Sequence, residues 1–134
     1  MDGKITLISP PDIFENSNLS ILLMHLSSED QDNISAWLYK NNIKKNINFY
    51  VYDDQDSIEW ILYASAICKY SFIDLNHQNT YTQTLASYLL GKHNFYYKIN
   101  DNEIASIYNF INNKRIIHIE NFLEDIFNSD IETN

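Results

Sequence analysis

The sequence predicts an α/β fold, in which a three-layer α/β/α sandwich is built around a mostly parallel sheet of five or six strands. Short apolar runs recur along the chain, and most of them are separated by amphipathic segments of helical period. Residues 69–97 read as strand, polar loop, helix, tight turn and strand, which is the repeating unit of a parallel sheet. A chain of 134 residues, 45% of them hydrophobic, suits a single domain over residues 1–134.

The first two predicted strands have no helix between them. Residues 4–9 (KITLIS) form a short strand that stops at Pro10, because proline cannot continue a strand ladder. Residues 19–26 (LSILLMHL) are almost continuously apolar, as in a strand that is covered on both faces. We therefore expect one of these two strands either to pair antiparallel or to lie at an edge of the sheet.

A helix and a third strand come next. Ser27 and the acids after it mark the start of the helix. Its apolar face carries Ile34, Trp37 and Leu38, which recur at helical spacing. The run Ile47–Tyr52 (INFYVY) is the third strand.

Capping-box spacing marks the starts of three further helices. The paired residues are Asp56 and Glu59, Thr80 and Gln83, and Asn100 and Glu103. Strands are predicted between these helices over residues 70–75 (YSFIDL) and 94–99 (NFYYKI). Gly91 stands where a helix ends in a left-handed cap.

The last part of the chain completes the alternation. Residues 115–119 (RIIHI) predict a short strand, and Phe122, Leu123 and Phe127 lie on one face of a final helix. Residues 129–134 are expected to be a frayed tail. The whole pattern is Rossmann-like or flavodoxin-like, so the carboxyl ends of the strands are expected at one edge of the sheet.

The charge balance argues against two classes of partner. Eighteen acidic residues stand against nine basic ones, which gives a formal net charge of −9, and Arg115 is the one arginine. Binding to nucleic acid requires a cationic face that displaces counterions from phosphates, and the sequence shows none. Binding to an anionic membrane surface is disfavoured for the same reason.

The cysteine usage and the amino-terminal sequence predict a cytoplasmic protein. A single cysteine, Cys68, cannot form an internal disulfide, and it falls on an apolar helical face, so we interpret it as a core residue. The first residues show no secretory signal, and no apolar run approaches the length of a membrane span. The abundance of Asn and Ile is typical of AT-rich genomes, such as those of many phages, in which case the host cytoplasm is the expected location.

Acidic and polar residues gather at the predicted carboxyl edge of the sheet. They are Asp12, Glu29, Asp30, Asp53, Asp54, Asp56, Asp74, Asn76, His77 and Asp101. The favoured interpretation is that they cap helices and solvate loops. Two alternatives are a Mg²⁺ site made by Asp53, Asp54 and Asp74, and a sugar site in which an acid binds ribose hydroxyls. Under the favoured interpretation no metal and no cofactor are expected.

Several well-known sites cannot be written on this sequence. The chain has two glycines, Gly3 and Gly91, so neither a GxGxxG turn nor a phosphate-binding P-loop is present. The four histidines show no metal-ligand spacing, and no serine lies in a GxSxG turn.

One stretch resembles a known family. From Asp74 to Lys92 the chain has the run D-x5-T-x-x-Q-x7-GK, which resembles the nucleoside 2-deoxyribosyltransferase-like superfamily. Residues 5–14 (ITLISPPDIF) look like the opening strand of that family. The resemblance implies that Asp74 helps to bind a sugar, that Thr80 opens a helix, and that Gly91 and Lys92 close it.

The position of the family's nucleophile differs in this sequence. The family has a glutamate there, whereas this chain has Gln83, whose amide cannot attack an anomeric carbon as a carboxylate does. Leu85 stands where the family has a small residue beside the sugar. The candidate catalytic residues are Asp54, Asp56 and Gln83, and we do not expect catalysis to be retained.

Two functions from different classes follow from these observations. The favoured one is a non-catalytic α/β accessory protein, possibly encoded by a phage, that acts through contacts with a protein partner. The alternative is a nucleoside- or nucleotide-binding protein with N-glycosidic hydrolase or deoxyribosyltransferase-like activity. Its candidate ligand-binding residues are Ser9, Asp12, Asp53, Asp74, Asn76, His77 and Thr80.

Overall fold

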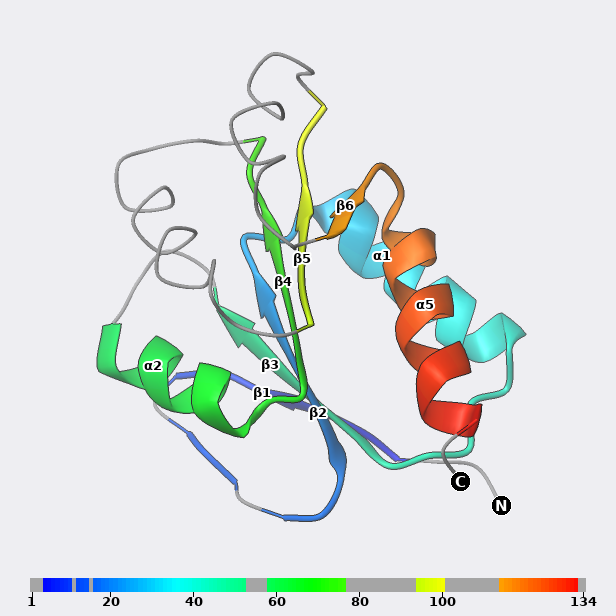
Figure 1. The fold of residues 1–134 in the computed structure, drawn as a ribbon. Coiled ribbons are helices and arrows are strands. Elements are labelled where there is room, and N and C mark those ends of the chain that lie inside the picture. The colour runs from blue at the N-terminus through cyan, green and yellow to red at the C-terminus, as the bar shows by residue number, and fades with distance from the viewer. Residues whose placement is uncertain are drawn as a thin grey trace.

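A parallel sheet of six strands runs through the middle of the molecule (Figure 1). The computed structural model describes residues 4–10, 12–14, 16–52, 58–76, 94–100 and 114–132. Its strands are β1 (Ile5–Ile8), β2 (Leu19–Met24), β3 (Ile47–Tyr52), β4 (Tyr70–Asp74), β5 (Phe95–Lys98) and β6 (Lys114–Ile116). They lie side by side in the order β1-β3-β2-β4-β5-β6, and every neighbouring pair is parallel.

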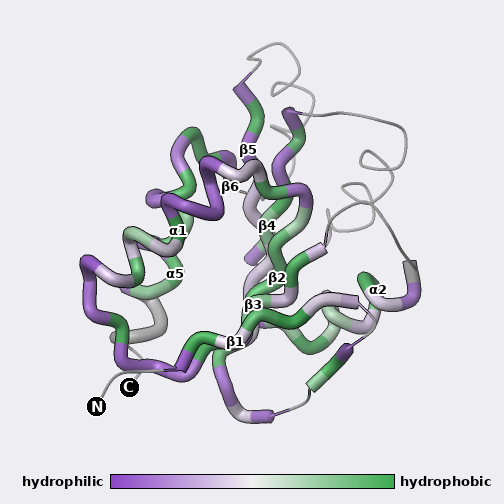
Figure 2. The backbone as a smooth tube through the Cα atoms, turned by 180° about the vertical axis from the view of Figure 1, so that it is seen from behind, coloured by the Kyte–Doolittle hydropathy of each residue, from purple (hydrophilic) through white to green (hydrophobic). Residues whose placement is uncertain are grey.

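Helices cover both faces of this sheet, as the predicted three-layer sandwich requires. On one face lie α1 (Ser28–Lys40) and α5 (Ile119–Glu132), and on the other lies α2 (Ile58–Ile67) (Figures 1 and 2). The helices predicted to start at Thr80 and Asn100 fall outside the described residues. The predicted α/β class with a parallel sheet is confirmed.

Strands β2 to β6 follow the flavodoxin-like order, with β2 in the middle between β3 and β4. To this set the chain adds β1, which lies at the edge of the sheet beside β3. The expectation that one of the first two strands lies at an edge is therefore confirmed. The other expectation, an antiparallel pairing, is wrong, because the chain returns from the end of β1 to the start of β2 before it enters the sheet again.

The described residues of this return (9, 10, 12–14 and 16–18) form no helix, and buried side chains of the α2 face hold them in place. The Trp60 indole Nε1–H donates to the carbonyl oxygen of Asp12 at 2.8 Å. The Tyr50 hydroxyl donates to the Phe14 carbonyl at 2.7 Å and accepts from the Phe14 N–H at 3.2 Å. These bonds satisfy backbone groups that a helix would have satisfied internally, which is why a non-helical crossover is stable here.

The core has one half on each face of the sheet. Alternate residues of the strands point to opposite faces, so β3 places Tyr50 toward α2 and Phe49 toward α1 and α5. The α2 side contains Ile8, Leu22, Met24, Tyr50, Tyr52, Trp60, Ile61, Ala64, Ile73, Leu75, Phe95, Tyr97 and Ile99. The other side contains Ile21, Leu23, Ile34, Ile47, Phe49, Tyr70, Phe72, Tyr96, Ile116, Ile119, Phe122, Leu123, Ile126 and Phe127.

Local chemistry explains where several elements begin and end. Ser27 caps α1, because its hydroxyl accepts from the Asp30 N–H at 3.1 Å. His25 has a φ of 60°, which ends β2 earlier than the predicted residue 26. The last strand is β6, which ends at Ile116 instead of residue 119, since Ile119 already belongs to α5 and is buried in its core. Helix α5 continues to Glu132, inside the segment that was expected to fray.

Cys68 lies just after α2 and packs against the core on that side. Burial raises the pKa of its thiol from 9.0 to about 12, so the thiol is protonated at neutral pH. Cys68 therefore packs against the core as expected, but it is only partly buried and lies one residue beyond the helix on which it was predicted. None of the described helices combines the length and the apolar character that crossing a bilayer would need.

Candidate functional site

The carboxyl ends of the described strands meet at one edge of the sheet, as predicted, because all of these strands run in the same direction. In open α/β sheets ligands bind at this edge, at the point where the strand order reverses. Here that point lies between β2 and β4, which are hydrogen-bonded neighbours although α1, β3 and α2 separate them in the chain. Among the described residues, Asp74 is a predicted site residue that adjoins this position, because it ends β4.

Asp74 is buried, with 3% of its surface exposed. Its Oδ1 accepts both the backbone N–H and the side-chain amide of Asn76, each at 2.9 Å. The Asn76 side-chain oxygen in turn accepts the Asn100 N–H at 2.8 Å. These contacts form an Asx-type turn that connects the ends of β4 and β5. They give Asp74 a role in holding this turn.

An ion pair lies beside Asp74 on the α1 side of the sheet. Lys98 ends β5 and pairs in register with Asp74, and strand alternation places both side chains on that side. The Lys98 ammonium contacts both carboxylate oxygens of Asp30, at 3.1 and 3.0 Å. Asp30 is 2% exposed, in the first turn of α1. Lys98 is therefore the register neighbour of Asp74 and the ion-pair partner of Asp30.

Ser9 and Asp12 belong to the same edge but lie away from Asp74. Both are exposed and follow β1, which β3 and β2 separate from β4. Three strand spacings place the two ends about 14 Å apart. The carbonyl of Asp12 is bonded to α2, whereas Asp74 faces α1. The structure thus does not bring Ser9 and Asp12 together with Asp74 and Asn76.

Most of the other predicted site residues lie outside the described residues. These are Asp53, Asp54, Asp56, His77, Thr80, Gln83 and Asp101. Within the described ranges, no group of three His, Cys, Asp or Glu side chains is arranged to hold a metal ion. The Mg²⁺ site and the sugar site therefore stay predictions.

Lys98 is the residue that the sequence reasoning missed. It lies in the apolar run NFYYKI, where a lysine is costly to bury unless an acid reaches it. The sequence contained a signal for this ion pair. Helix α1 begins with two acids, and strand alternation puts Lys98 on the same face as Tyr96. What the sequence did not reveal is which strand lies under the start of α1.

A hollow lies on the α1 side of the sheet, next to the edge strand β1. This apolar hollow of about 200 Å³, which we call the edge groove, opens between α1 and the strands β1, β3 and β2. It is lined by Leu7, Ser9, Leu23, Leu26, Gln31, Ile34, Ser35, Phe49 and Val51. None of these side chains carries a charge. Leu7 on the edge strand is 72% exposed, so this end of the sheet is not covered as the centre is.

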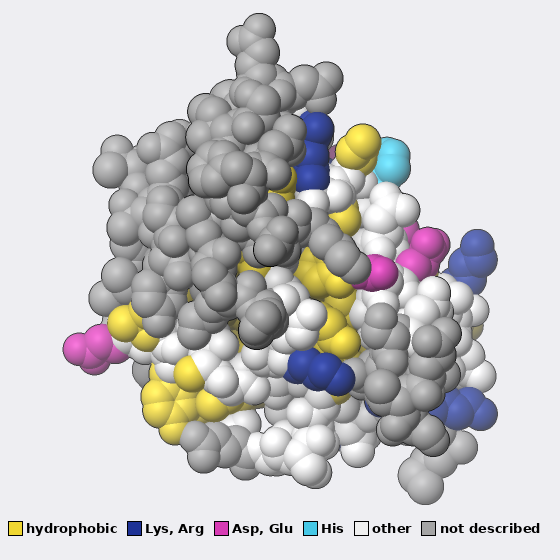
Figure 3. Space-filling view, viewed as in Figure 1, with side chains coloured by type: hydrophobic (Ala, Val, Ile, Leu, Met, Phe, Trp, Pro, Cys, Tyr) yellow, Lys and Arg dark blue, Asp and Glu magenta, His cyan; other side chains and the backbone are white. Residues whose placement is uncertain are grey.

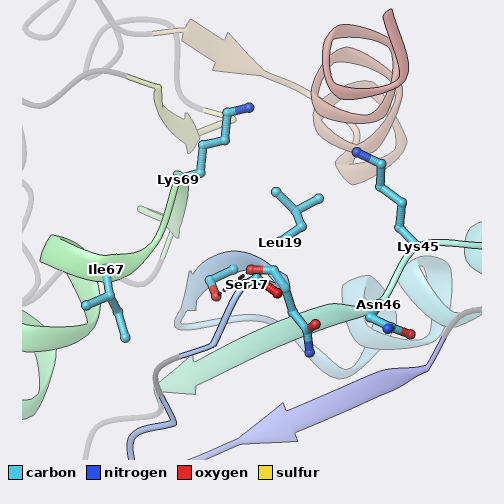
Figure 4. A pocket seen from close by; sticks show the side chains of 8 residues that line it. Ser17, Leu19, Lys45, Asn46, Ile67 and Lys69 are labelled. Carbon is cyan, nitrogen blue, oxygen red and sulfur yellow. Dashed lines mark hydrogen bonds between the residues drawn. The ribbon is translucent and has the colours of Figure 1, made fainter. Parts of the chain in front are cut away.

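A larger hollow, of about 480 Å³, lies at the opposite edge, where the strands begin (Figure 4). We call it the amino-edge pocket. It is lined by Ser17, Asn18, Leu19, Ser20, Lys45, Asn46, Ile67 and Lys69. Unlike the edge groove, it is rich in polar side chains and contains two lysines.

A scan against protein-family models finds no match to this chain, and a search of curated proteins finds none that is significantly similar.

Proposed function

We propose that the protein is a non-catalytic interaction module that binds an extended, apolar segment of another protein along the edge strand β1. The observation that carries this proposal is the exposure of Leu7 and, to a lesser degree, of Ile5, which is 39% exposed. Both residues lie in β1, whose outer edge pairs with no strand in the described part of the chain. An apolar edge strand of this kind readily accepts a further strand.

The edge groove gives such a segment a place for a side chain. Leu7 and Phe49 pair in register on neighbouring strands, and both line the groove together with Leu26 from the end of β2. Its wall carries no charge, so an inserted side chain must be uncharged to avoid desolvation without a partner. Strand pairing with β1 would supply affinity, and the groove would supply selectivity.

The charge of the chain favours a different protein over a second copy as the occupant. The formal net charge is −9, so two copies would repel each other when they met at β1. A partner with basic residues around an apolar strand would be attracted and oriented by the same field. The partner that fits is therefore a basic protein that presents an uncharged, extended segment.

The described carboxyl edge is consistent with a module that has no catalytic role. Asp30 is bonded to Lys98, and Asp74 is bonded to Asn76. Both carboxylates thus contribute to the fold. We place the function in a cytoplasm, the host's if a phage encodes the chain, since Cys68 is a protonated core thiol and reducing conditions suit it.

Site-directed photo-crosslinking tests the proposal. A photoreactive amino acid replaces Leu7 in the full chain. The same amino acid replaces Tyr39 as the control, because Tyr39 is 91% exposed on α1 and does not line the edge groove. We expect the photoreactive group at position 7 to form an adduct with the basic partner protein, and the group at position 39 to form none. A synthetic peptide of alternating Val and Thr with flanking lysines should compete the adduct away. An adduct with twice the mass of the chain would mean that a second copy is the occupant, and no adduct, or one that the peptide leaves in place, would refute β1 docking.

The nucleoside-binding alternative has one observation in its favour. Asp74 lies next to the point between β2 and β4 where ligands bind in sheets of this order. Nucleosides, nucleotides and Mg²⁺ can be screened by thermal shift, since a ligand at about 100 times its dissociation constant stabilises a fold by about 2.7 kcal/mol. A shift that Asp74→Ala removes would favour this function, and the absence of any shift would exclude it.

A further inference from the structure

The outer edge of β1, which pairs with no described strand, presents its backbone through two residues. The Ile47 N–H donates to the Lys4 carbonyl at 2.9 Å, and Ile47 is the register partner of Ile5. Along a strand, successive residues direct their N–H and C=O groups to alternate sides. Lys4 and every second residue after it therefore face β3, whereas Ile5 and Leu7 direct both groups outward. A docked strand pairs with these two residues.

Leu7 also decides which side chain of a docked strand reaches the edge groove. Leu7 lines the groove, so its side chain lies on the α1 side of the sheet. Residues that pair across neighbouring strands point to the same face. The partner residue that pairs with Leu7 therefore points to the α1 side as well. Its side chain must pass over Leu7 before it meets Phe49 on β3, and so it has to be long.

The volume of the edge groove suits one large side chain. Small-molecule sites span about 300 to 1,000 Å³. The groove, at about 200 Å³, is smaller than that. Its floor consists of Leu23, Phe49 and Val51, which are all apolar. The floor therefore favours an aliphatic or aromatic group, inserted from the docked strand.

The α1 wall of the groove differs from this floor, because it carries hydrogen-bonding side chains. Gln31 and Ser35 line the groove, and four residues separate them, which puts them on one face of α1. Both are exposed, so their amide and hydroxyl are accessible from the groove. An amide and a hydroxyl can each donate and accept a hydrogen bond. The groove thus combines an apolar floor with an uncharged polar wall.

We propose that the groove recognises a tyrosine of the partner segment, at the position that pairs with Leu7. The ring of the tyrosine lies on the apolar floor, and its hydroxyl bonds to Gln31 and Ser35. Tyrosine is long, uncharged and apolar along its ring, and its hydroxyl needs a hydrogen-bonding partner when it is buried. Phenylalanine and leucine match the floor but not the wall. This inference rests on the proposed function and names the residue that the β1 site selects.

Peptide binding to the unmodified full chain tests the inference. The probes are three peptides of alternating Val and Thr with flanking lysines, which carry tyrosine, phenylalanine or aspartate at one central position. We expect the tyrosine peptide to bind about three- to tenfold more tightly than the phenylalanine peptide, the effect of a hydrogen bond between uncharged groups. The aspartate peptide should bind most weakly, because its charge is desolvated without a partner. Titration calorimetry measures all three affinities.

Variants of α1 then connect the preference to the groove. The double variant Gln31→Met, Ser35→Ala removes both polar groups and should bind the tyrosine and phenylalanine peptides equally. The matched control is Ser28→Ala, the same serine substitution at an exposed position of α1 that does not line the groove. This control should keep the preference for tyrosine.

The outcomes separate this inference from the proposed function. If none of the peptides binds, docking at β1 is refuted, and the tyrosine site with it. If the tyrosine and phenylalanine peptides bind the unmodified chain equally, docking stands and only the tyrosine site is refuted. A preference that survives in the double variant, or that Ser28→Ala also removes, would likewise refute recognition by Gln31 and Ser35.

Discussion

Lys98 and Asp30 join the end of β5 to the first turn of α1 through two contacts, at 3.1 and 3.0 Å, in a place from which water is largely excluded. The chain separates the two residues by β3, α2 and β4. A buried pair of this kind contributes little net stability as a pair, but the loss of one partner leaves a buried charge without compensation.

We therefore expect Lys98→Met to lower the free energy of unfolding by about 3 to 5 kcal/mol. The double variant Asp30→Asn, Lys98→Met should recover much of that loss, since no buried charge is left uncompensated. Urea denaturation of the two variants beside the unmodified chain measures both effects. If the double variant is as unstable as the single one, the ion pair is not the cause.

The return from β1 to β2 gives a second prediction. Tyr50→Phe removes the hydroxyl that both donates to and accepts from the backbone of Phe14, and we expect a loss of about 1 to 3 kcal/mol in unfolding free energy. Tyr39→Phe is the control, because Tyr39 is exposed to solvent and its hydroxyl is expected to add nothing. Equal unfolding midpoints for the two variants would show that Tyr50 does not hold the connection.

Two substitutions of Asp74 test whether this residue holds the turn after β4 or serves to bind a ligand. Asp74→Asn keeps an oxygen that can accept the Asn76 N–H, so stability should change little, whereas Asp74→Ala leaves that N–H without its acceptor and should cost about 1 to 2 kcal/mol. Thermal unfolding without ligand measures this. A large loss of stability in Asp74→Asn would contradict the idea that Asp74 is needed to accept the Asn76 N–H in this turn.

Cys68 makes stability depend on pH in the alkaline range. Its pKa is raised from 9.0 to about 12 in the folded protein, so the folded state binds more protons than the unfolded state between these values. Its contribution is therefore complete below pH 9.0 and falls as the pH rises toward 12. The measurement is the unfolding free energy of the unmodified chain and of Cys68→Ala from about pH 8 to about pH 10. Above pH 9.0 we expect the unfolding free energy of the unmodified chain to fall relative to that of Cys68→Ala. A constant difference would mean that the thiol ionises alike in both states.

The sequence allowed the fold class to be predicted because hydrophobic period and capping chemistry are local. Ser27 and Ile34 are enough to place α1, and the run INFYVY is enough to place β3. The position of β1 could not be predicted in this way, since it depends on Tyr50 and Trp60 binding a segment that has no periodicity of its own.

The candidate site was harder to predict than the fold. Strand direction placed Asp74 at the correct edge, because parallel strands all end there. It did not reveal that Asp74 and Asp12 lie on different faces and three strands apart, which depends on strand order and on side-chain alternation together. Lys98 was overlooked for the same reason, since its partner comes from a distant element.

The place of β1 also sets a sequence of events during translation. β1 leaves the ribosome before the other described strands, yet its register partners are in β3, which is made only after all of β2 and α1. β2 must likewise wait for β3 and β4 on its two sides. The apolar segment Ile5–Ile8 is therefore synthesised early and docked late, and the nascent chain must carry it unprotected until Tyr52 has emerged.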